Sequence, residues 1–501
     1  MRFKKLRLNT ISSVLYQVVA VICGFVLPRL IIINYGSTVN GLVSSISQFL
    51  SVISFLELGM GAVVQSSLYR PLAEKDELQI SKIITSANRF FRRIAIILAI
   101  YILVLLFVYP LFINKEYSWL YTVLLILAIS ISYFAQYYFG VVDRLLLTAD
   151  QRGYIQYTAQ AITLLANTVF CAILMRWNAS IQVVKLVTSI VYLTRPFVLR
   201  LYVNRHYAIN RNEWYDKEPI NQKWNGVAQH IAACVLDGTD TIVLTLFSTL
   251  ENVSIYSVYF LVVNGVKQLV LVMMNGVQSL MGELLAKNEN DNLKSFFGYF
   301  EWILHNAVVL IFGCMGVLIL PFIQIYTNAA NDVNYYQPLF AFLIVLANAA
   351  HCLRLPYNML ILAAGHYKQT QWNYITAMCI NIVISVIAVV NWGLIGVALG
   401  TLIAMAYQTV WMAVYDSKNI IGWPIKNFVK QVISDVIIVI MALLGCSLIS
   451  IKEYTYVSLF VYAIKIGLTW VVCISVINML LFGVRVKETV SKFKCLLKRG
   501  R

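Results

Sequence analysis

Charged side chains are scarce in this sequence. Only 12% of its 501 residues are Asp, Glu, Lys or Arg, and just 22 are acidic. Soluble domains carry about 25% charged residues, so the scarcity argues against a water-soluble enzyme. Hydrophobic residues make up 60% of the chain, and they form blocks of about twenty or more, the length needed to cross a hydrocarbon core about 30 Å thick. The composition therefore predicts a polytopic membrane protein.

Cysteine and histidine follow no pattern that would build a disulfide framework or a metal site. The nine cysteines are scattered without a CxxC pair, and almost all lie inside apolar segments, where cysteine serves as a small core residue. The five histidines show no HExxH or comparable spacing, which would mark a zinc site. We therefore expect no resident metal and no cofactor.

Apolar segments and basic residues together define a topology. We predict an all-α protein with about fourteen transmembrane helices, at residues 10–34, 40–66, 93–113, 119–142, 155–175, 181–203, 226–247, 253–283, 299–324, 337–362, 371–391, 394–416, 428–450 and 456–483. If the N-terminus is cytoplasmic, about 30 basic residues lie on that side and about three on the other, Lys115, Arg176 and Lys452, which is the positive-inside asymmetry. Both termini are then cytoplasmic. Most of the basic residues behind the net charge of +17 therefore lie in cytoplasmic segments and orient the protein in the membrane. They do not indicate nucleic acid binding.

A weak internal repeat divides the segments into two halves. Val64-Gln65-Ser66 recurs as Val277-Gln278-Ser279, and Asn167 recurs as Asn381, at a shared offset of about 214 residues. The repeat predicts two six-helix lobes related by a parallel pseudo-repeat. In transporters this arrangement places the substrate between the halves and favours alternating access. The predicted domains are an N-lobe at 1–203, a cytoplasmic loop at 204–225, a C-lobe at 226–417, a C-terminal helix pair at 428–483 and a basic cytoplasmic tail at 484–501.

The N-terminal run resembles the opening of a known family. The residues that carry the likeness are Pro28-Arg29, Tyr35-Gly36, Gly41-Leu42, the run from Phe55 to Gly61, and Leu72-Ala73. They resemble the Wzx-type polysaccharide repeat-unit flippases of the multidrug/oligosaccharidyl-lipid/polysaccharide (MOP) exporter superfamily, which also contains MATE antiporters and lipid II flippases. The resemblance implies a MATE-like fold and the movement of an undecaprenyl-diphosphate-linked oligosaccharide from the inner to the outer leaflet. The additional helices 13 and 14 separate such flippases from MATE exporters.

Charges inside the predicted spans are candidates for the transport pathway, because each costs about 2.5 to 3.5 kcal/mol to insert. Six are basic and four acidic, and a diphosphate carrier needs cations that neutralise it, with Arg offering bidentate geometry. The surplus of cations therefore favours an anionic substrate. We predict a substrate-binding set of Arg29, Arg195, Lys267, Arg354 and Glu57, where the basic residue at Arg29 is also implied by the resemblance. Structural alternatives stay open for each, including a Lys267–Asp237 ion pair and a Glu57–Arg354 pair.

Two carboxylates are candidates for ion coupling. Asp237 and Asp240 are three residues apart and share one helix face, so they can hold Na⁺ or H⁺ for antiport. The resemblance implies a cation site on helices 7, 11 and 12, which adds Asn381, Ser385 and Thr401 as oxygen donors.

These observations predict a transporter, not an enzyme, in the bacterial cytoplasmic membrane. The expected partners are the undecaprenyl-diphosphate oligosaccharide and membrane lipids, with the basic tail on anionic lipid; polysaccharide-assembly glycosyltransferases and a polymerase are further candidates, and nucleic acid is not expected. One alternative is a multidrug or metabolite cation antiporter of MATE type, against which helices 13 and 14 and the cation surplus argue. A second is a membrane oligosaccharide polymerase or ligase, which the short outer loops disfavour.

Overall fold

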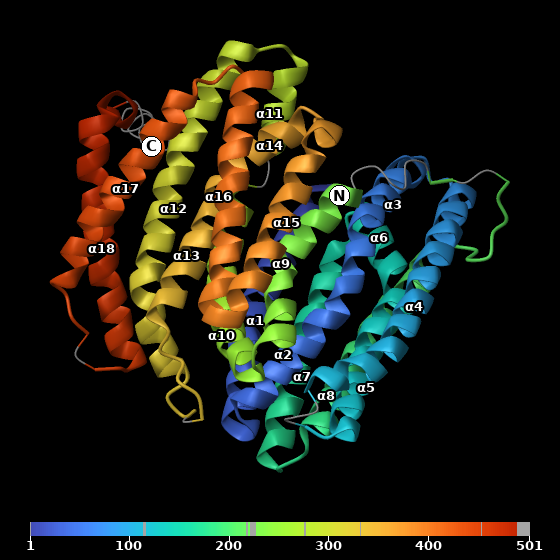
Figure 1. Cartoon of the computed structure of the whole chain (residues 1–501). Coiled ribbons are helices and arrows are strands. Elements are labelled where there is room, and N and C mark those ends of the chain that lie inside the picture. Colours follow the sequence, from blue (N-terminus) through green and yellow to red (C-terminus); the bar gives the residue numbers. More distant parts are fainter. Residues whose placement is uncertain are drawn as a thin grey trace. The chain divides into compact units, whose positions relative to one another are not determined.

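The computed structural model describes residues 2–113, 117–216, 219–220, 227–274, 277–330, 332–451 and 453–487, which form helices joined by loops, with no strand among them (Figure 1). Lys115, Lys452, much of the predicted loop 204–225 and most of the predicted basic tail lie outside these residues. Twelve helices are long and apolar enough to cross a membrane. The two other predicted spans are also helical, at Ser37–Glu74, which is broken by a 3-10 turn, and at Val227–Phe247. The prediction of an all-α multi-pass membrane protein is confirmed, with fourteen as an approximate count.

Contacts divide the chain into an N-terminal unit, Met1–Ser254, and a C-terminal unit, Ile255–Arg501. The helices of the N-terminal unit are α1 (Arg2–Tyr35), α2 (Ser37–Ser51), η1 (Val52–Ser54), α3 (Phe55–Glu74), α4 (Glu77–Ile113), α5 (Trp119–Ala135), η2 (Gln136–Gly140), α6 (Val141–Ala149), α7 (Gly153–Arg176), α8 (Ile181–His206) and α9 (Val227–Phe247), followed by the start of α10 (Leu250–Met273). The C-terminal unit continues with α11 (Val277–Ala286), α12 (Asn290–Tyr326), α13 (Pro338–Leu353), α14 (Leu355–Ala363), α15 (Tyr367–Trp392), α16 (Leu394–Asn419), α17 (Ile425–Ser447) and α18 (Tyr456–Leu481). The lobe boundaries expected from the sequence repeat stay a prediction.

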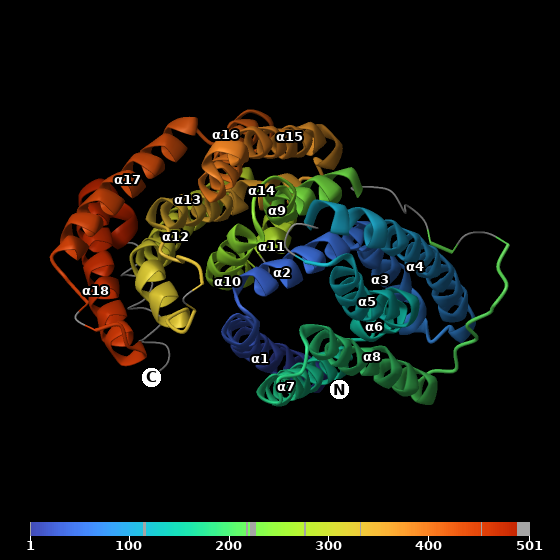
Figure 2. The same ribbon diagram turned by 60° about the horizontal axis from the view of Figure 1, so that its bottom comes forward.

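Polar side chains join helices inside the N-terminal unit. Ser45 of α2 accepts hydrogen bonds of 2.7 Å from Tyr109 of α4 and from Thr245 of α9. Asn40 of α2 donates to Ser254 at 2.9 Å. Such bonds add to van der Waals packing in a membrane, where the hydrophobic effect gives helices little reason to associate. Figure 2 shows α1, α7 and α8 next to one another on one side of this unit.

Small residues bring helices together in the C-terminal unit. Gly396 and Gly400 of α16 face the backbone of α15, and a methyl group at Gly400 would collide with Ser385 Oγ. Trp470 of α18 lies against Gly313 of α12 and is fully buried. A core of α12, α17 and α18 side chains surrounds it, including Val309, Ile438 and Ile466. The predicted C-terminal helix pair, α17 and α18, is therefore packed onto α12.

The outward faces of several long helices remain apolar. Leu111 of α4 is 72% exposed, and Val457 and Leu480 of α18 are 76% and 74% exposed. Exposed apolar surface of this extent is a liability in water, but it suits contact with lipid tails. The exposure pattern thus agrees with the multi-pass membrane topology.

Candidate functional site: basic clusters in both units

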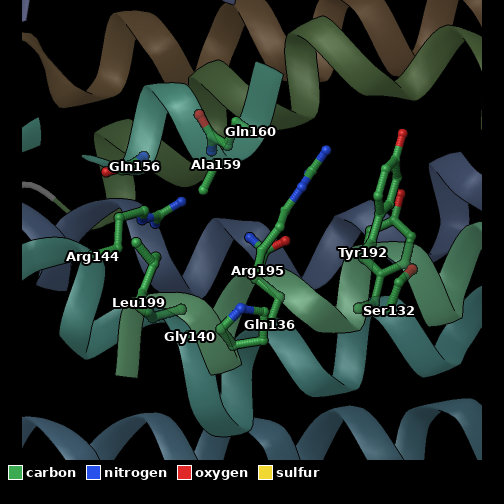
Figure 3. Close-up of a pocket in the computed structure, with 13 residues that line it drawn as sticks. Ser132, Gln136, Gly140, Arg144, Gln156, Ala159, Gln160, Tyr192, Arg195 and Leu199 are labelled. Atoms are coloured by element: carbon green, nitrogen blue, oxygen red, sulfur yellow. The ribbon is translucent and has the colours of Figure 1, made fainter. Parts of the chain in front are cut away.

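The N-terminal unit contains a polar cavity of about 260 Å³ among η2, α6, α7 and α8. Its polar lining consists of Ser132, Tyr133, Gln136, Arg144, Gln156, Gln160, Tyr192 and Arg195. Figure 3 shows Arg144 and Arg195 extending toward α7, on which Gln156, Ala159 and Gln160 lie. The cavity therefore combines two cations with neutral amide and hydroxyl groups.

Local backbone irregularity shapes this cavity. Residues Gln136–Gly140 form a π-helical turn between α5 and α6, a feature often found at functional sites. Pro196 lies opposite in α8, and a Cβ atom at Gly140 would lie 3.2 Å from that of Pro196. Because position 140 has no side chain, α8 packs closely against the π turn, while Gln136 at its start lines the cavity.

Arg195 is held in place by two neighbours. Its Nε donates to Thr163 Oγ1 at 2.5 Å, and its guanidinium carbon lies 3.9 Å from the centroid of the Tyr192 ring. A cation over an aromatic face is stabilised by about 0.5 to 2 kcal/mol. These contacts preorganise the guanidinium, so that a bound anion would not have to order it.

A second cavity of about 170 Å³ shares Ser132, Tyr133 and Tyr192 with the first. Lys185 of α8 lines it, about 15 Å along the helix from Arg195. Tyr133 donates to Ser47 O at 3.3 Å.

No Asp or Glu is among the described residues that line the two cavities. Asp143, which precedes Arg144, is buried and forms an ion pair of 2.8 Å with Arg211. Lys185, Arg195 and Arg144 thus form a cationic series, which we name the N-terminal basic track. Guanidinium groups bind phosphate oxygens in bidentate geometry, and the surrounding amides and hydroxyls can hydrogen-bond a polyhydroxyl ligand.

The C-terminal unit contains a second set of basic side chains, Lys267, His351 and Arg354, which we name the C-terminal basic cluster. All three are buried. Arg354 Nη2 lies 3.0 Å from His351 Nδ1, and both Lys267 and Arg354 lie close enough to His351 to influence its charge. Arg354 occupies the break between α13 and α14, just before Pro356. The structure thus brings together two predicted site residues, Lys267 and Arg354.

Arg29 and Glu57 are placed differently from these residues. Leu27 and Ile31 of α1 line the second cavity, and helical geometry puts Arg29, midway between them, on the opposite side of α1. Glu57 lies in α3, but its side chain falls outside the described part of the structure. No pairing of Glu57 is therefore described.

The predicted cation-coupling residues fall into two groups. Asp237 and Asp240 lie in α9 of the N-terminal unit, where Asp240 is buried and the Asp237 side chain is outside the described residues. In the C-terminal unit, Asn381 Nδ2 donates to Thr401 Oγ1 at 2.9 Å, and Ser385 Oγ donates to Val397 O at 3.4 Å. The predicted oxygen donors of α15 and α16 are therefore neighbours and bond across the helix interface.

Sequence reasoning missed several residues of these sites. The expected fourth span ends at residue 142, which places Arg144 in a cytoplasmic loop, whereas the helical span runs to Ala149. Gln156, Gln160 and Tyr192 carry no charge and gave no signal in a search for ionisable groups. His351 precedes Arg354 by three residues, so a search for helical neighbours of Arg354 would have found it.

A charged cluster outside the spans connects α1 to the α6–α7 loop. Asp150 accepts from Lys5 Nζ at 3.2 Å, from Arg152 Nε at 2.8 Å and from Tyr207 OH at 2.5 Å. Burial and the hydrogen bond to Asp150 raise the pKa of Tyr207. This cluster fixes one end of α1 to the loop that begins α7.

Solved structures share this fold. No family model and no curated protein matches the sequence. The lipid II flippase MurJ, in an inward closed conformation, superposes with a TM-score of 0.70 at 15% identity, over 95% of this chain and 99% of that one. The Vibrio cholerae MATE transporter VcmN gives a TM-score of 0.58 at 12% identity, over 83% of this chain and 98% of that one. An inward-facing multidrug MATE transporter of the MOP superfamily gives 0.56 at 13% identity, over 81% and 94%.

The chain has the MurJ- and MATE-like fold. The two MATE structures each leave more of the chain unmatched than the lipid II flippase does. The MATE-like fold implied by the sequence is thereby confirmed.

Proposed function

We propose that this protein is a flippase that moves undecaprenyl-diphosphate-linked oligosaccharide repeat units from the inner to the outer leaflet of the bacterial cytoplasmic membrane. The observation that carries the proposal is the N-terminal basic track, because cations, amides and hydroxyls line its two cavities beside apolar side chains, and no carboxylate does so among the described residues. A diphosphate supplies the anion and the sugars supply hydroxyl groups, so both parts of the substrate match the lining.

The C-terminal basic cluster supports the same proposal. Lys267 and Arg354 are buried cations at membrane depth, where each is costly unless it serves a pair or a pathway. We propose that both units contribute cations to diphosphate passage by alternating access, with Arg29 as an additional contact. The lipid II flippase structure matches 95% of this chain, against 81% to 83% for the two MATE structures, and this difference supports a lipid-linked substrate over a soluble drug.

Ion coupling is a separate part of the proposal. Asp237 and Asp240 are the candidate acceptors for Na⁺ or H⁺, with Asn381, Ser385 and Thr401 as additional oxygen donors. An imposed Na⁺ or proton gradient should change the transfer rate in vesicles, and Asp240→Asn should remove that response without removing basal transfer.

Transfer of a fluorescent undecaprenyl-diphosphate oligosaccharide between the leaflets of proteoliposomes tests the function. The wild-type protein should accelerate transfer above that of empty vesicles, and Arg144→Ala and Arg195→Ala should each lower the rate by about tenfold or more, since a charge-assisted hydrogen bond contributes about 1.5 to 3 kcal/mol. Arg176→Ala is the matched control, because Arg176 is exposed at the end of α7.

Two outcomes contradict the proposal. Wild-type protein that does not transfer the lipid, but extrudes cationic dyes along an ion gradient, would indicate the MATE-type alternative. Transfer that is equally fast in the Arg144, Arg195 and Arg176 variants would remove the basic track from the mechanism.

A further inference from the structure

A second polar cluster in the C-terminal unit is built mainly from carboxyl groups. Glu301 and His305 lie one turn apart on α12 and are 2% and 0% exposed. Glu301 accepts hydrogen bonds from Tyr357 of α14 and from Trp423 Nε1 at 3.0 Å. His305 Nδ1 lies 2.5 Å from Asp435 Oδ2 of α17. The cluster therefore connects α12 to both α14 and α17.

The charges of this cluster do not balance if every carboxyl is ionised. A third carboxyl, Asp416 of α16, is buried, lies within electrostatic range of Tyr357, and finds no hydrogen-bond partner for either oxygen among the described residues. On the basic side, Arg485 acts on Glu301 while it donates to Gly298 O at 2.9 Å. Three neighbouring buried carboxylates against one guanidinium are strongly disfavoured, and such groups retain protons instead.

The helices packed against α12 supply the other charged and titratable groups that bear on this balance. Tyr357 from α14, Asp416 from α16, Asp435 from α17 and Arg485 after α18 face the cluster. Three other titratable groups on helices next to α12 interact outside the cluster. Glu283 of α11 pairs with Lys287, His351 of α13 contacts Arg354, and Lys465 of α18 is exposed. Compensation must therefore come from protons bound within the cluster.

A cavity connects the cluster to the protein surface. It has a volume of about 240 Å³, and its lining includes Glu301, Gln431, Lys430 and Arg485. Lys430 is exposed and donates to Leu481 O at 2.9 Å. Glu301 thus has an access route for water, while His305, one turn further along α12, is fully buried.

His305 and Ser434 show that the cluster has further hydrogen-bonding capacity. Nδ1 of His305 is engaged by Asp435, but its Nε2 has no partner in the described part of the chain. Ser434 Oγ, next to Asp435 on α17, is fully buried and is also unpartnered there. Unpaired buried polar atoms are uncommon in folded proteins, so these atoms mark a place where hydrogen bonds can rearrange when a proton arrives or leaves.

We propose that Glu301, His305 and Asp435 form a proton-binding site, which exchanges a proton with water in the adjoining cavity and thereby changes the hydrogen bonds that hold α17 to α12. The site is distinct from the basic cluster of Lys267, His351 and Arg354 and from the candidate coupling residues Asp237 and Asp240. It binds its proton whether or not the protein transports a lipid-linked oligosaccharide.

Infrared difference spectroscopy of the purified full-length protein between about pH 5 and about pH 8 tests this site, the range in which histidine titrates when unperturbed. The wild-type protein should show a carboxylic acid band that titrates in this range and shifts in D₂O. Glu301→Gln or Asp435→Asn should remove one such band. His305→Gln should move the midpoint of the remaining band by about one pH unit, because the groups titrate as a coupled set.

Controls separate proton binding from structural damage. Glu453→Gln removes an exposed carboxyl and should leave the titrating band unchanged. Glu301→Gln keeps an acceptor oxygen for Tyr357 and Trp423; if it does not purify as a monodisperse protein, Asp435→Asn asks the same question. The proposal is overturned if the wild-type protein shows no titrating carboxylic acid band, or if the band is the same in the Glu301, Asp435 and Glu453 variants.

Discussion

The basic side chains of the two units differ in how far they are buried and in what they contact. In the N-terminal unit, Arg144 and Arg195 are half-buried and border a cavity. In the C-terminal unit, Lys267 and Arg354 are only 4% and 6% exposed, and Arg354 contacts His351 directly. A cation beside a cavity can meet a ligand without rearrangement, whereas a packed cation must first lose its neighbours. The basic track is therefore better prepared to bind an anion in the described conformation than the basic cluster is.

Carboxyl groups are also distributed unequally. The N-terminal cavities are free of them among the described residues, whereas the C-terminal unit buries Glu301, Asp416 and Asp435 near one another. An acid-free lining preserves the attraction for an anionic substrate, and a carboxyl-rich cluster selects protons or cations. The difference supports the proposals that the N-terminal cavities contact an anionic substrate and that the carboxyl-rich cluster of the C-terminal unit binds protons.

The largest expected effect tests whether the basic groups of both units act on the same step. Arg195→Gln and Arg354→Gln should each slow oligosaccharide transfer by about tenfold or more, for about 1.5 to 3 kcal/mol, and the double variant should lose less than the product of the two effects, because groups that act on one charge are not additive. Initial transfer rates in proteoliposomes are measured for the wild-type protein, the two single variants and the double variant, which together form a double-mutant cycle. Normal transfer by Arg354→Gln would instead make the C-terminal basic cluster structural, and the two units would differ in function as well as in packing.

A smaller effect is expected from filling the close contact beside the proton site. A methyl group at Gly298 would collide with Trp423 and lie 3.3 Å from an Arg485 nitrogen. Gly298→Ala should therefore destabilise the protein by about 1 to 3 kcal/mol, the usual cost of overpacking, and should displace the Trp423 donor from Glu301. Thermal unfolding in detergent and the tryptophan fluorescence spectrum report the change.

Gly467→Ala in α18 is the matched control, because nothing lies within 4 Å of its added carbon. It should leave the unfolding temperature unchanged or slightly raised. Equal destabilisation by the two substitutions would show that the contact with Trp423 is not the cause.

A still smaller effect is expected at the α15–α16 interface. The Asn381–Thr401 hydrogen bond should contribute about 0.6 kcal/mol, the mean for polar pairs between membrane helices, as measured by a double-mutant cycle of Asn381→Ala and Thr401→Val on unfolding. Repeating the cycle with and without Na⁺ asks whether these oxygens also bind a cation. A coupling energy that changes with Na⁺ would give the C-terminal unit a cation site in addition to its proton site.

Much of the fold followed from the sequence, because apolar segments long enough to span a membrane have few alternatives to helix formation. The details of the sites did not. A π turn at Gln136–Gly140 extends the fourth span to Ala149 and brings Arg144 into the cavity, and no composition rule predicts such a turn. The expected span begins near residue 299, only two residues before Glu301, whereas α12 begins at Asn290, which places Glu301 three turns inside the helix.

The roles predicted for individual residues stay predictions, but the structure shows which of these residues are neighbours. The resemblance supplied Asn381, Ser385 and Thr401 as candidates, and in the structure Asn381 of α15 donates to Thr401 of α16. Partners on different helices could be predicted only from the depth of each residue in the membrane, and depth alone did not identify the partner of Asp435. His305 is that partner, and a count of Asp, Glu, Lys and Arg inside the spans does not include histidine.

The smallest expected effect concerns Tyr207, in the charged cluster outside the spans. Burial and its hydrogen bond to Asp150 raise its pKa above the ordinary value, so the folded state holds this proton more tightly than the unfolded state does. The resulting stabilisation is complete below about pH 10, the unperturbed value, and is lost as the pH rises through the folded value. Wild-type protein should therefore lose stability above about pH 10, whereas Tyr207→Phe should lose less over the same range. Unfolding temperatures measured from about pH 7 to about pH 11 give the difference. Tyr207 does not titrate between about pH 5 and about pH 8, so a change of stability in that lower range has to come from other groups. If this change persists in Tyr207→Phe and is lost in Glu301→Gln, it comes from the proton-binding site of the C-terminal unit.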